Sequence, residues 1–488
     1  MSLGQSIKRL FKHSAVYGIG HIFNRSIGFL LLPLYTNIFP KSEFGIAGLM
    51  FTYLAILKIF YTYGLDVAFF RFFMLEDEES EKNKIFTSAY ASILVIAVLF
   101  SALLLFGAAP AARALFSHDA AQLDIDLTRL IRLASGILLF DALALLPLLL
   151  LRAKEKSLAF VLFNSVNVLA NIAGNIVFLA VLHRGVEGIF YANLFASGLT
   201  FALTFPIALR HLTLTPSLQR LRELFAFGLP YLPSTLAVVV MDTIDRVFLE
   251  RLAGVEEVGL YNAGAKLGMF MALFVAAFRF AWHPFFLATS KQPDAKQVFS
   301  RVFTYVMLVC LALFLTLSIF IDDVARFRFA GYSLIGEAFW DSTAVVPLIM
   351  LAYVFYAAYC NFLIGIYLYK KSGYLPYITA AAMAGNLVAN TLLIPHWGMM
   401  GAAWARMIAY IIMAAALYVV AQRLYRIEYE WSRVIRLAVL VALLTAAGCS
   451  EAVQQRFLTK ITVLALFPAG LLLTGILPLG RIRALLKK

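Results

Sequence analysis

Long apolar runs separated by short polar stretches recur along the chain from residue 12 onward. A helix needs roughly 20 mainly apolar residues to cross the hydrocarbon core of a bilayer. The pattern therefore predicts an all-α membrane protein with fourteen spans. They are expected at 12–38, 43–70, 84–108, 127–151, 157–182, 186–209, 222–250, 256–284, 297–321, 342–369, 374–395, 399–422, 433–449 and 459–479.

Composition agrees with a location in lipid. Hydrophobic residues make up 62% of the 488 positions and charged residues only 14%, and the mean hydropathy is +0.86. A soluble protein needs more polar surface than this chain can supply. The first apolar segment lacks a small-residue cleavage pattern, so we expect it to be retained as a span.

The positive charge is explained by topology. The formal charge is +14, and Lys and Arg lie mostly in the short predicted loops. Loops on the side of the N-terminus hold more than twice as many of them as the opposite loops, and such an excess marks the cytoplasmic side. The distribution predicts cytoplasmic N and C termini, and no nucleic-acid partner is needed to explain the charge.

A segment of the first half, 156–188, recurs in the second half as 371–401. We therefore expect two pseudo-symmetric six-helix lobes, 1–211 and 212–425, followed by two C-terminal helices within 426–488. Repeated membrane bundles commonly carry their ligand site between the halves. The matches are Lys156-Ser157 with Lys371-Ser372, Asn171 and Asn175 with Asn386 and Asn390, Gly185 and Gly188 with Gly398 and Gly401, and more weakly Glu43-Phe44-Gly45 with Glu257-Val258-Gly259.

Charged residues inside the predicted spans indicate a polar interior. An ionised side chain at the bilayer centre costs roughly 2.5–3.5 kcal/mol, so each must face a watery cavity or a partner. An ion pair to another helix explains any single residue, but the excess of positive charge favours an anionic ligand. The basic residues are Arg25, Lys58, Arg246, Lys266, Arg279 and Arg406, and the acidic residues are Asp66, Asp141, Asp242 and Asp245.

Several polar residues have helical spacing. Asp242 and Arg246 are four residues apart, which suits a structural ion pair, with gating as the alternative. The two Asn pairs of the repeat also have this spacing. Their amides either line a cavity and bind sugar hydroxyls or hold neighbouring helices together.

Other function classes find no support in the sequence. Cys310, Cys360 and Cys449 are far apart in apolar stretches, and no His pair has metal-binding spacing. No phosphate-binding loop for ATP occurs, and no connection is long enough for a catalytic domain. We therefore predict no cofactor and no enzymatic activity, only transport within the membrane.

Several motifs resemble the polysaccharide transporter branch of the superfamily that contains multidrug and toxin extrusion exporters and lipid II flippases. The resemblance covers about residues 12–425. It implies two lobes around a V-shaped cavity that alternates between inward-open and outward-open states. The motifs are Gly64-Leu65-Asp66-Val67-Ala68-Phe69-Phe70-Arg71-Phe72, Asp245-Arg246, Val258-Gly259-Leu260-Tyr261 with Gly264-Ala265, and Ala281-Trp282-x-Pro284-Phe285.

The resemblance also implies roles for individual residues. Arg25, Lys58 and Lys266 match by position the cavity residues that contact a diphosphate, and we add Arg279 and the Asn pairs as substrate contacts. The last two helices resemble an extra pair that flanks a groove for a lipid tail. Candidates for gating or coupling are Asp66, Arg71, Asp141, Asp242, Asp245 and Arg246.

Together with the intramembrane charges, the resemblance implies a monomeric flippase in a bacterial inner membrane that moves undecaprenyl-diphosphate-linked oligosaccharide to the outer leaflet. The product would be a surface polysaccharide such as O-antigen of lipopolysaccharide. The partners of the flippase would be this lipid-linked sugar and membrane lipids. The membrane potential, or exchange of H⁺ or Na⁺, would drive it. The alternatives are a cation-coupled multidrug exporter and a membrane-embedded glycosyltransferase or O-antigen ligase.

Overall fold

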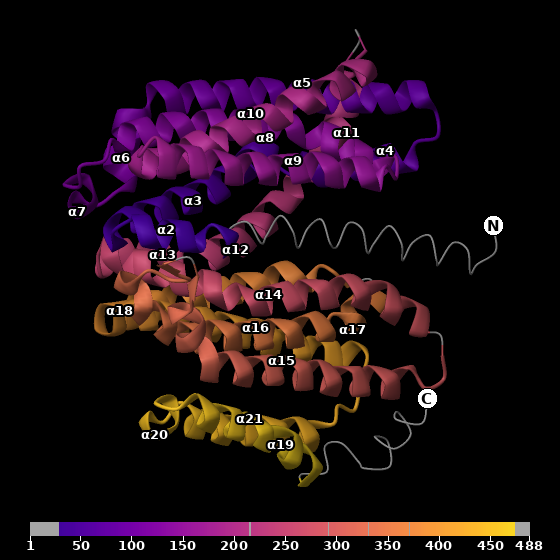
Figure 1. The fold of residues 1–488 in the computed structure, drawn as a ribbon. Coiled ribbons are helices and arrows are strands. Elements are labelled where there is room, and N and C mark those ends of the chain that lie inside the picture. The colour runs from indigo at the N-terminus through magenta and orange to yellow at the C-terminus, as the bar shows by residue number, and fades with distance from the viewer. Residues whose placement is uncertain (1–28, 214–215, 291, 330, 370, 474–488) are drawn as a thin grey trace. The chain divides into compact units, whose positions relative to one another are not determined.

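The computed structural model describes residues 29–213, 216–290, 292–329, 331–369 and 371–473. Within these ranges the chain is almost entirely helical, which confirms the predicted all-α class (Figure 1). The strands found there are β1 (Arg328–Phe329) and β2 (Tyr332–Ser333), which pair antiparallel in a small hairpin. The chain divides into two compact units, residues 1–262 with 394–399, and residues 263–393 with 400–488.

The first unit is built around α8, which packs against α5 and α10, while α3 and α4 also contact it. In Figure 1 these are the indigo and magenta helices. In chain order the elements are α2 (Leu32–Ile38), α3 (Lys41–Thr62), α4 (Leu65–Leu75), α5 (Glu79–Phe106), α6 (Ala108–Leu115), α7 (His118–Ala121), α8 (Leu127–Ala153), α9 (Ser157–Asn175), the π-helix η1 (Ile176–Val181), α10 (Gly185–His211), α11 (Leu218–Gly228), the 3₁₀ turn η2 (Leu229–Tyr231), α12 (Leu232–Thr243) and α13 (Asp245–Leu252).

The second unit is organised around α15, which packs against α16, α19 and α21. Two long helices, α14 and α18, have residues in both units. The elements are α14 (Val255–Thr289), α15 (Ala295–Arg326), the 3₁₀ helix η3 (Glu337–Val345), α16 (Val346–Phe362), α17 (Ile364–Leu368), α18 (Tyr374–Leu424), α19 (Trp431–Gly448), α20 (Glu451–Gln454) and α21 (Phe457–Leu473).

Eleven helices in the described ranges are long and apolar enough to cross a membrane, and Phe457–Leu472 is a shorter apolar helix. Fourteen spans and their orientation stay a prediction. The difference has three sources: α18 contains two predicted spans, α21 is short, and most of the span 12–38 lies outside the described residues.

Two glycines adopt a backbone conformation with positive φ, each at a change in chain direction. Gly185 is the first residue of α10 and has φ of +58°, and its repeat partner Gly398 interrupts α18 with φ of +50°. Glycine adopts this conformation without the steric cost that a side chain would impose. The matching turns support the internal repeat that the sequence predicts.

The predicted span 43–70 is two helices rather than one. Tyr63 and Gly64 both have positive φ, at +34° and +79°, and they separate α3 from α4. A Cβ at Gly64 would lie 2.2 Å from the carbonyl oxygen of Gly228, so α11 approaches this break closely. Apolar periodicity continues through the break, which is why the sequence pattern alone does not reveal it.

Apolar side chains cover the outer face of α5. Val95, Leu99 and Leu103 are more than half exposed although they are large and hydrophobic. In water such a stripe would be costly, whereas lipid chains solvate it without penalty. The surface of the first unit therefore agrees with a membrane location.

Candidate substrate site

In the first unit Lys58 of α3 lies beside Asp141 of α8. The Lys58 Nζ is 2.9 Å from Asp141 Oδ2, and the Ser197 hydroxyl on α10 donates to Asp141 Oδ1 at 2.7 Å. The Lys58 side chain is 50% exposed and that of Asp141 29%. The structure thus joins two residues to which the sequence assigns separate roles, and it leaves the Lys58 side chain half exposed.

The first Asn pair lies in the interior of the first unit. Asn175 donates to the side-chain oxygen of Asn171 at 3.0 Å and accepts a hydrogen bond of 2.9 Å from the Tyr35 hydroxyl. Asn171 is 6% exposed and Asn175 is fully buried. In this conformation the amides connect α9 to α2, and their role as sugar contacts stays a prediction.

The second Asn pair has the same arrangement in the second half of the chain. Asn390 donates to the side-chain oxygen of Asn386 at 3.1 Å, and both residues are fully buried. Equivalent hydrogen bonds in both copies show that the repeat preserves an interior polar contact. Such contacts hold membrane helices together.

Asp66 and Arg71 lie on α4, just beyond the break at Gly64. Asp66 is in the first turn, where a carboxylate is favoured by the positive end of the helix dipole. The Arg71 guanidinium lies 4.1 Å from the centre of the Phe227 ring of α11. These contacts connect α4 to α11, and a gating or coupling role for either residue stays a prediction.

A buried polar group forms where α13 approaches the start of α14. The Tyr261 hydroxyl donates to Asp245 Oδ2 at 2.8 Å, and Asp245 is fully buried. Arg246 Nε lies 3.4 Å from Asn262 Oδ1, and its guanidinium is 6.0 Å from the Tyr261 ring. Asp242 lies one turn earlier, near the end of α12, and its pairing with Arg246 stays a prediction.

In the second unit Arg279 of α14 meets a group of tyrosines. Arg279 Nη1 donates to the Tyr356 hydroxyl at 2.9 Å. Tyr356 stacks on Tyr359 and contacts Tyr410, with ring centres 5.9 Å and 5.3 Å apart. Arg279 is half-buried, so a cation and several phenol groups are presented together.

The tyrosines of this group are functional candidates that we do not single out from the sequence. Their signal is the spacing Tyr353-x-x-Tyr356-x-x-Tyr359, which places three rings along one side of α16. Aromatic residues at helical spacing usually form core. Only the contact with Arg279 distinguishes these from ordinary packing.

Polar atoms without hydrogen-bond partners lie near the same region. Among the described residues, the His283 Nε2 and both amide atoms of Asn361 are buried and make no hydrogen bond. The His283 ring is 5.1 Å from that of Tyr367. Unsatisfied buried polar atoms are costly, and a bound polar ligand or water would relieve that cost.

Lys266 and Arg25 are the other two basic residues predicted to contact the diphosphate. Lys266 is half-buried on α14. Arg25 lies outside the described residues. The described part of the chain contains no group of three or more His, Cys, Asp or Glu side chains that could hold a metal ion.

An apolar groove runs between α14, α15 and α21 in the second unit. Its volume is about 710 Å³, and ten of its eleven lining residues are hydrophobic, with Thr316 the exception. Phe270 and Met271 come from α14, and Phe467 and Leu471 from α21. The groove lies beside the C-terminal helices where the resemblance implies a lipid tail.

Comparison with known proteins identifies the family. A family model described as polysaccharide biosynthesis protein matches residues 10–290. The chain belongs to this family. A comparison with curated proteins finds no match.

Solved structures with the same fold are transporters. The lipid II flippase MurJ, in an inward closed conformation, is similar with a TM-score of 0.75 and 15% identity, over 93% of this chain and 98% of that one. An inward-facing multidrug resistance transporter of the MATE family has a TM-score of 0.65 and 15% identity, over 83% and 94%. The Vibrio cholerae MATE transporter VcmN has a TM-score of 0.56 and 17% identity, over 85% and 96%. The family match confirms the resemblance to polysaccharide transporters that the sequence motifs indicate, and these structures show that the fold is shared.

Proposed function

We propose that this protein is a flippase for undecaprenyl-diphosphate-linked oligosaccharide in the inner membrane of a bacterium. It would work by alternating access between two lobes, residues 1–211 and 212–425, with both termini in the cytoplasm. The observation that carries the proposal is the half-exposed Lys58, which pairs with Asp141 in a polysaccharide biosynthesis protein with the fold of a lipid II flippase.

The barrier that such a protein removes is the transfer of the head group. Each buried hydroxyl without a hydrogen bond costs a few kcal/mol, so a saccharide does not cross hydrocarbon alone. A diphosphate adds charge that needs cationic partners. Lys58 is half exposed and pairs with Asp141, and Arg279 is half-buried and donates to Tyr356. A phosphate oxygen can replace either partner.

The lipid part of the substrate does not need to leave an apolar environment. The groove lined by α14, α15 and α21 offers hydrophobic walls along predicted spans. A polyprenyl chain lying there remains solvated while the head group moves through the polar interior. This supports the lipid-tail role that we propose for the C-terminal helices.

The charge of the substrate provides a driving force. A diphosphate with about two negative charges that leaves a negative-inside cell gains roughly 4–5 kcal/mol per 100 mV. Exchange with H⁺ or Na⁺ would add to this, and we assign the coupling role to Asp141, which contacts Lys58 directly.

The test is translocation of a fluorescent polyprenyl-diphosphate saccharide in proteoliposomes. Native protein is expected to expose the sugar to an added quencher, and Lys58→Met with Arg279→Gln to abolish this activity. Arg328→Gln is the matched control, because Arg328 is an exposed cation that pairs with Glu337 outside the candidate site. Equal rates for native and doubly substituted protein would refute the proposed head-group contacts, and no translocation by native protein would refute the function.

A multidrug exporter is the second candidate, because the MATE structures share the fold and Asp141 is an accessible carboxylate. It predicts efflux of organic cations that depends on Asp141 rather than on Lys58. Parallel assays with an organic cation and the lipid-linked saccharide separate the two. Transport of the cation alone would favour the exporter.

A further inference from the structure

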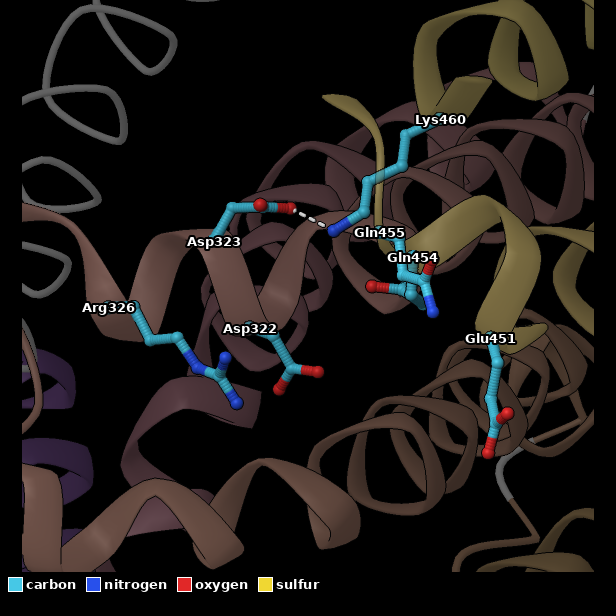
Figure 2. A pocket seen from close by; sticks show the side chains of 7 residues that line it. All are labelled: Asp322, Asp323, Arg326, Glu451, Gln454, Gln455 and Lys460. Carbon is cyan, nitrogen blue, oxygen red and sulfur yellow. Dashed lines mark hydrogen bonds and ion pairs between the residues drawn. The ribbon is translucent and has the colours of Figure 1, made fainter. Parts of the chain in front are cut away.

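A polar pocket of about 340 Å³ lies in the second unit at the end of α15, beside α20 and the start of α21 (Figure 2). α15 ends at Arg326, α19 ends at Gly448 and α21 begins at Phe457. Because three predicted spans end here, the pocket lies at the depth of lipid head groups. The topology prediction assigns it to the outer leaflet. Its lining residues are Asp322, Asp323, Arg326, Glu451, Gln454, Gln455 and Lys460.

An ion pair between a buried lysine and an exposed aspartate closes one side of this pocket. Lys460 Nζ lies 2.6 Å from Asp323 Oδ2, and Lys460 is only 2% exposed. The dashed line in Figure 2 marks this contact. The pair ties α21 to α15, and the two opposite charges compensate each other.

Three charged side chains remain to meet a ligand. The carboxylates of Asp322 and Glu451 form no ion pair and no side-chain hydrogen bond with any described residue. The guanidinium of Arg326 lies over the Trp340 ring at 4.7 Å. The face of the guanidinium is thus covered by the ring, while the N–H groups along its edge stay open to hydrogen-bond acceptors. The remaining charge is two negative and one positive.

The apolar groove adjoins the pocket along the same two helices. Val324 lines the groove, whereas its neighbours Asp322 and Asp323 line the pocket. On α21, Lys460 belongs to the pocket and Phe467 to the groove. A charged compartment at head-group depth that continues into an apolar compartment has the form of a membrane lipid.

We propose that pocket and groove together bind a phospholipid with a primary-amine head group, phosphatidylethanolamine. Its ammonium would donate hydrogen bonds to Asp322 and Glu451, its phosphate would accept from Arg326, and an acyl chain would lie in the groove. The two carboxylates repel an anionic head group such as phosphatidylglycerol. A quaternary ammonium, as in phosphatidylcholine, has no N–H to donate.

This site differs from the one proposed for the diphosphate, because an excess of carboxylates does not attract phosphate. The phospholipid site does not depend on the proposed function. If the flippase proposal also holds, phospholipid and polyprenyl chain would compete for one groove.

The test is native mass spectrometry of the full-length protein, delipidated and then titrated with phosphatidylethanolamine, phosphatidylglycerol or phosphatidylcholine in separate samples without any saccharide. We expect the ethanolamine lipid to bind several-fold more tightly than the other two. Asp322→Asn with Glu451→Gln is expected to weaken it about tenfold or more, because charge-assisted hydrogen bonds are lost. Glu337→Gln is the control, since Glu337 is an exposed carboxylate outside the pocket.

A groove substitution gives a second, independent readout. Leu313→Trp adds volume to the apolar wall and leaves the charged residues unchanged. It is expected to reduce binding of all three lipids alike. The carboxamide variant, Asp322→Asn with Glu451→Gln, is instead expected to lose only the preference for ethanolamine. Equal binding of the three lipids by native protein, or unchanged preference in the carboxamide variant, would overturn the proposal whether or not saccharide translocation is observed.

Discussion

Gly45 and Gly259, which occupy equivalent positions in the two repeats, lie against each other. A Cβ on Gly45 would come within 3.2 Å of the Gly259 nitrogen, and a Cβ on Gly259 within 3.3 Å of the Gly45 nitrogen. One turn further, Gly48 contacts Asn262, its own repeat partner. Reciprocal contacts between equivalent residues are the signature of a two-fold relation. The weak sequence match at Glu43-Phe44-Gly45 thus marks a close helix crossing.

Alanine at either glycine is expected to destabilise the protein. The added Cβ would meet backbone, at 2.2 Å from the Val255 oxygen for Gly45→Ala and 2.0 Å from the Lys41 oxygen for Gly259→Ala. Overpacking of this kind costs about 1–3 kcal/mol, measurable by thermal unfolding in detergent. Gly373→Ala is the control, because a Cβ at Gly373 would meet no atom within 4 Å. Equal melting temperatures for all three variants would show that α3 and α14 do not pack this closely.

Replacing Lys58 is expected to affect transport more than stability. The Lys58–Asp141 pair is substantially exposed, and such pairs contribute at most about 1 kcal/mol to folding. Loss of a charge-assisted contact to phosphate corresponds to about 10–100-fold in affinity. Lys58→Met should therefore raise the KM for the lipid-linked saccharide with little change in melting temperature.

Asp141→Asn separates binding from coupling at the same site. It removes the competing carboxylate but keeps the ammonium, so the KM should not rise. Ser197→Ala, which removes only the hydrogen bond to Asp141, is the matched control. A rise in KM for Asp141→Asn equal to that for Lys58→Met would indicate that the pair acts as a structural unit.

Arg279 is expected to need its guanidinium as well as its charge. Arg279→Lys keeps the charge but loses the planar guanidinium, which donates to Tyr356 and under our proposal would also donate to a phosphate. We expect an activity between those of native protein and Arg279→Gln. Tyr356→Phe removes the competing acceptor and should leave the KM unchanged or lower it. Saccharide translocation measured over a range of substrate concentrations provides the comparison, and equal rates for Lys and Gln at position 279 would contradict this role.

Most helices could be predicted from apolar run length, because the bilayer imposes that length. The breaks could not. The Tyr63–Gly64 break depends on the close approach of Gly228, a contact between residues far apart in sequence. The kink at Gly398 is signalled only by its repeat partner Gly185.

The candidate site was predictable as a set of residue types but not as a set of contacts. Intramembrane charge singles out Lys58 and Asp141 separately, and nothing in their spacing indicates that α3 and α8 bring them together. The sequence does not single out Tyr356, because an aromatic residue in an apolar helix usually belongs to the packed core. Its partner Arg279 comes from another helix, and only the fold brings the two together.

Removing an amide from either Asn pair is expected to reduce stability in both halves of the chain. Asn175→Ala removes the hydrogen bond that the buried Tyr35 hydroxyl donates to Asn175, and Asn390→Ala removes the hydrogen bond to Asn386. Loss of one intramolecular hydrogen bond costs about 0.5–1.5 kcal/mol. Thermal unfolding should show lower melting temperatures, with an unchanged KM in the fraction that stays folded. A higher KM at unchanged melting temperature would instead favour the alternative, in which these amides bind sugar.

Cysteine labelling in intact cells tests the predicted orientation. In a background with Cys449→Ala, which removes the exposed native thiol, Asp77→Cys and Asp119→Cys place single exposed thiols in successive loops, while Cys310 and Cys360 are buried. The excess of Lys and Arg assigns the loop of Asp77 to the cytoplasm and that of Asp119 to the outside. A membrane-impermeant maleimide should therefore modify only Asp119→Cys in intact cells and both variants after lysis. Labelling of Asp77→Cys in intact cells would reverse the orientation, and the polar pocket at the end of α15 would then face the cytoplasmic leaflet.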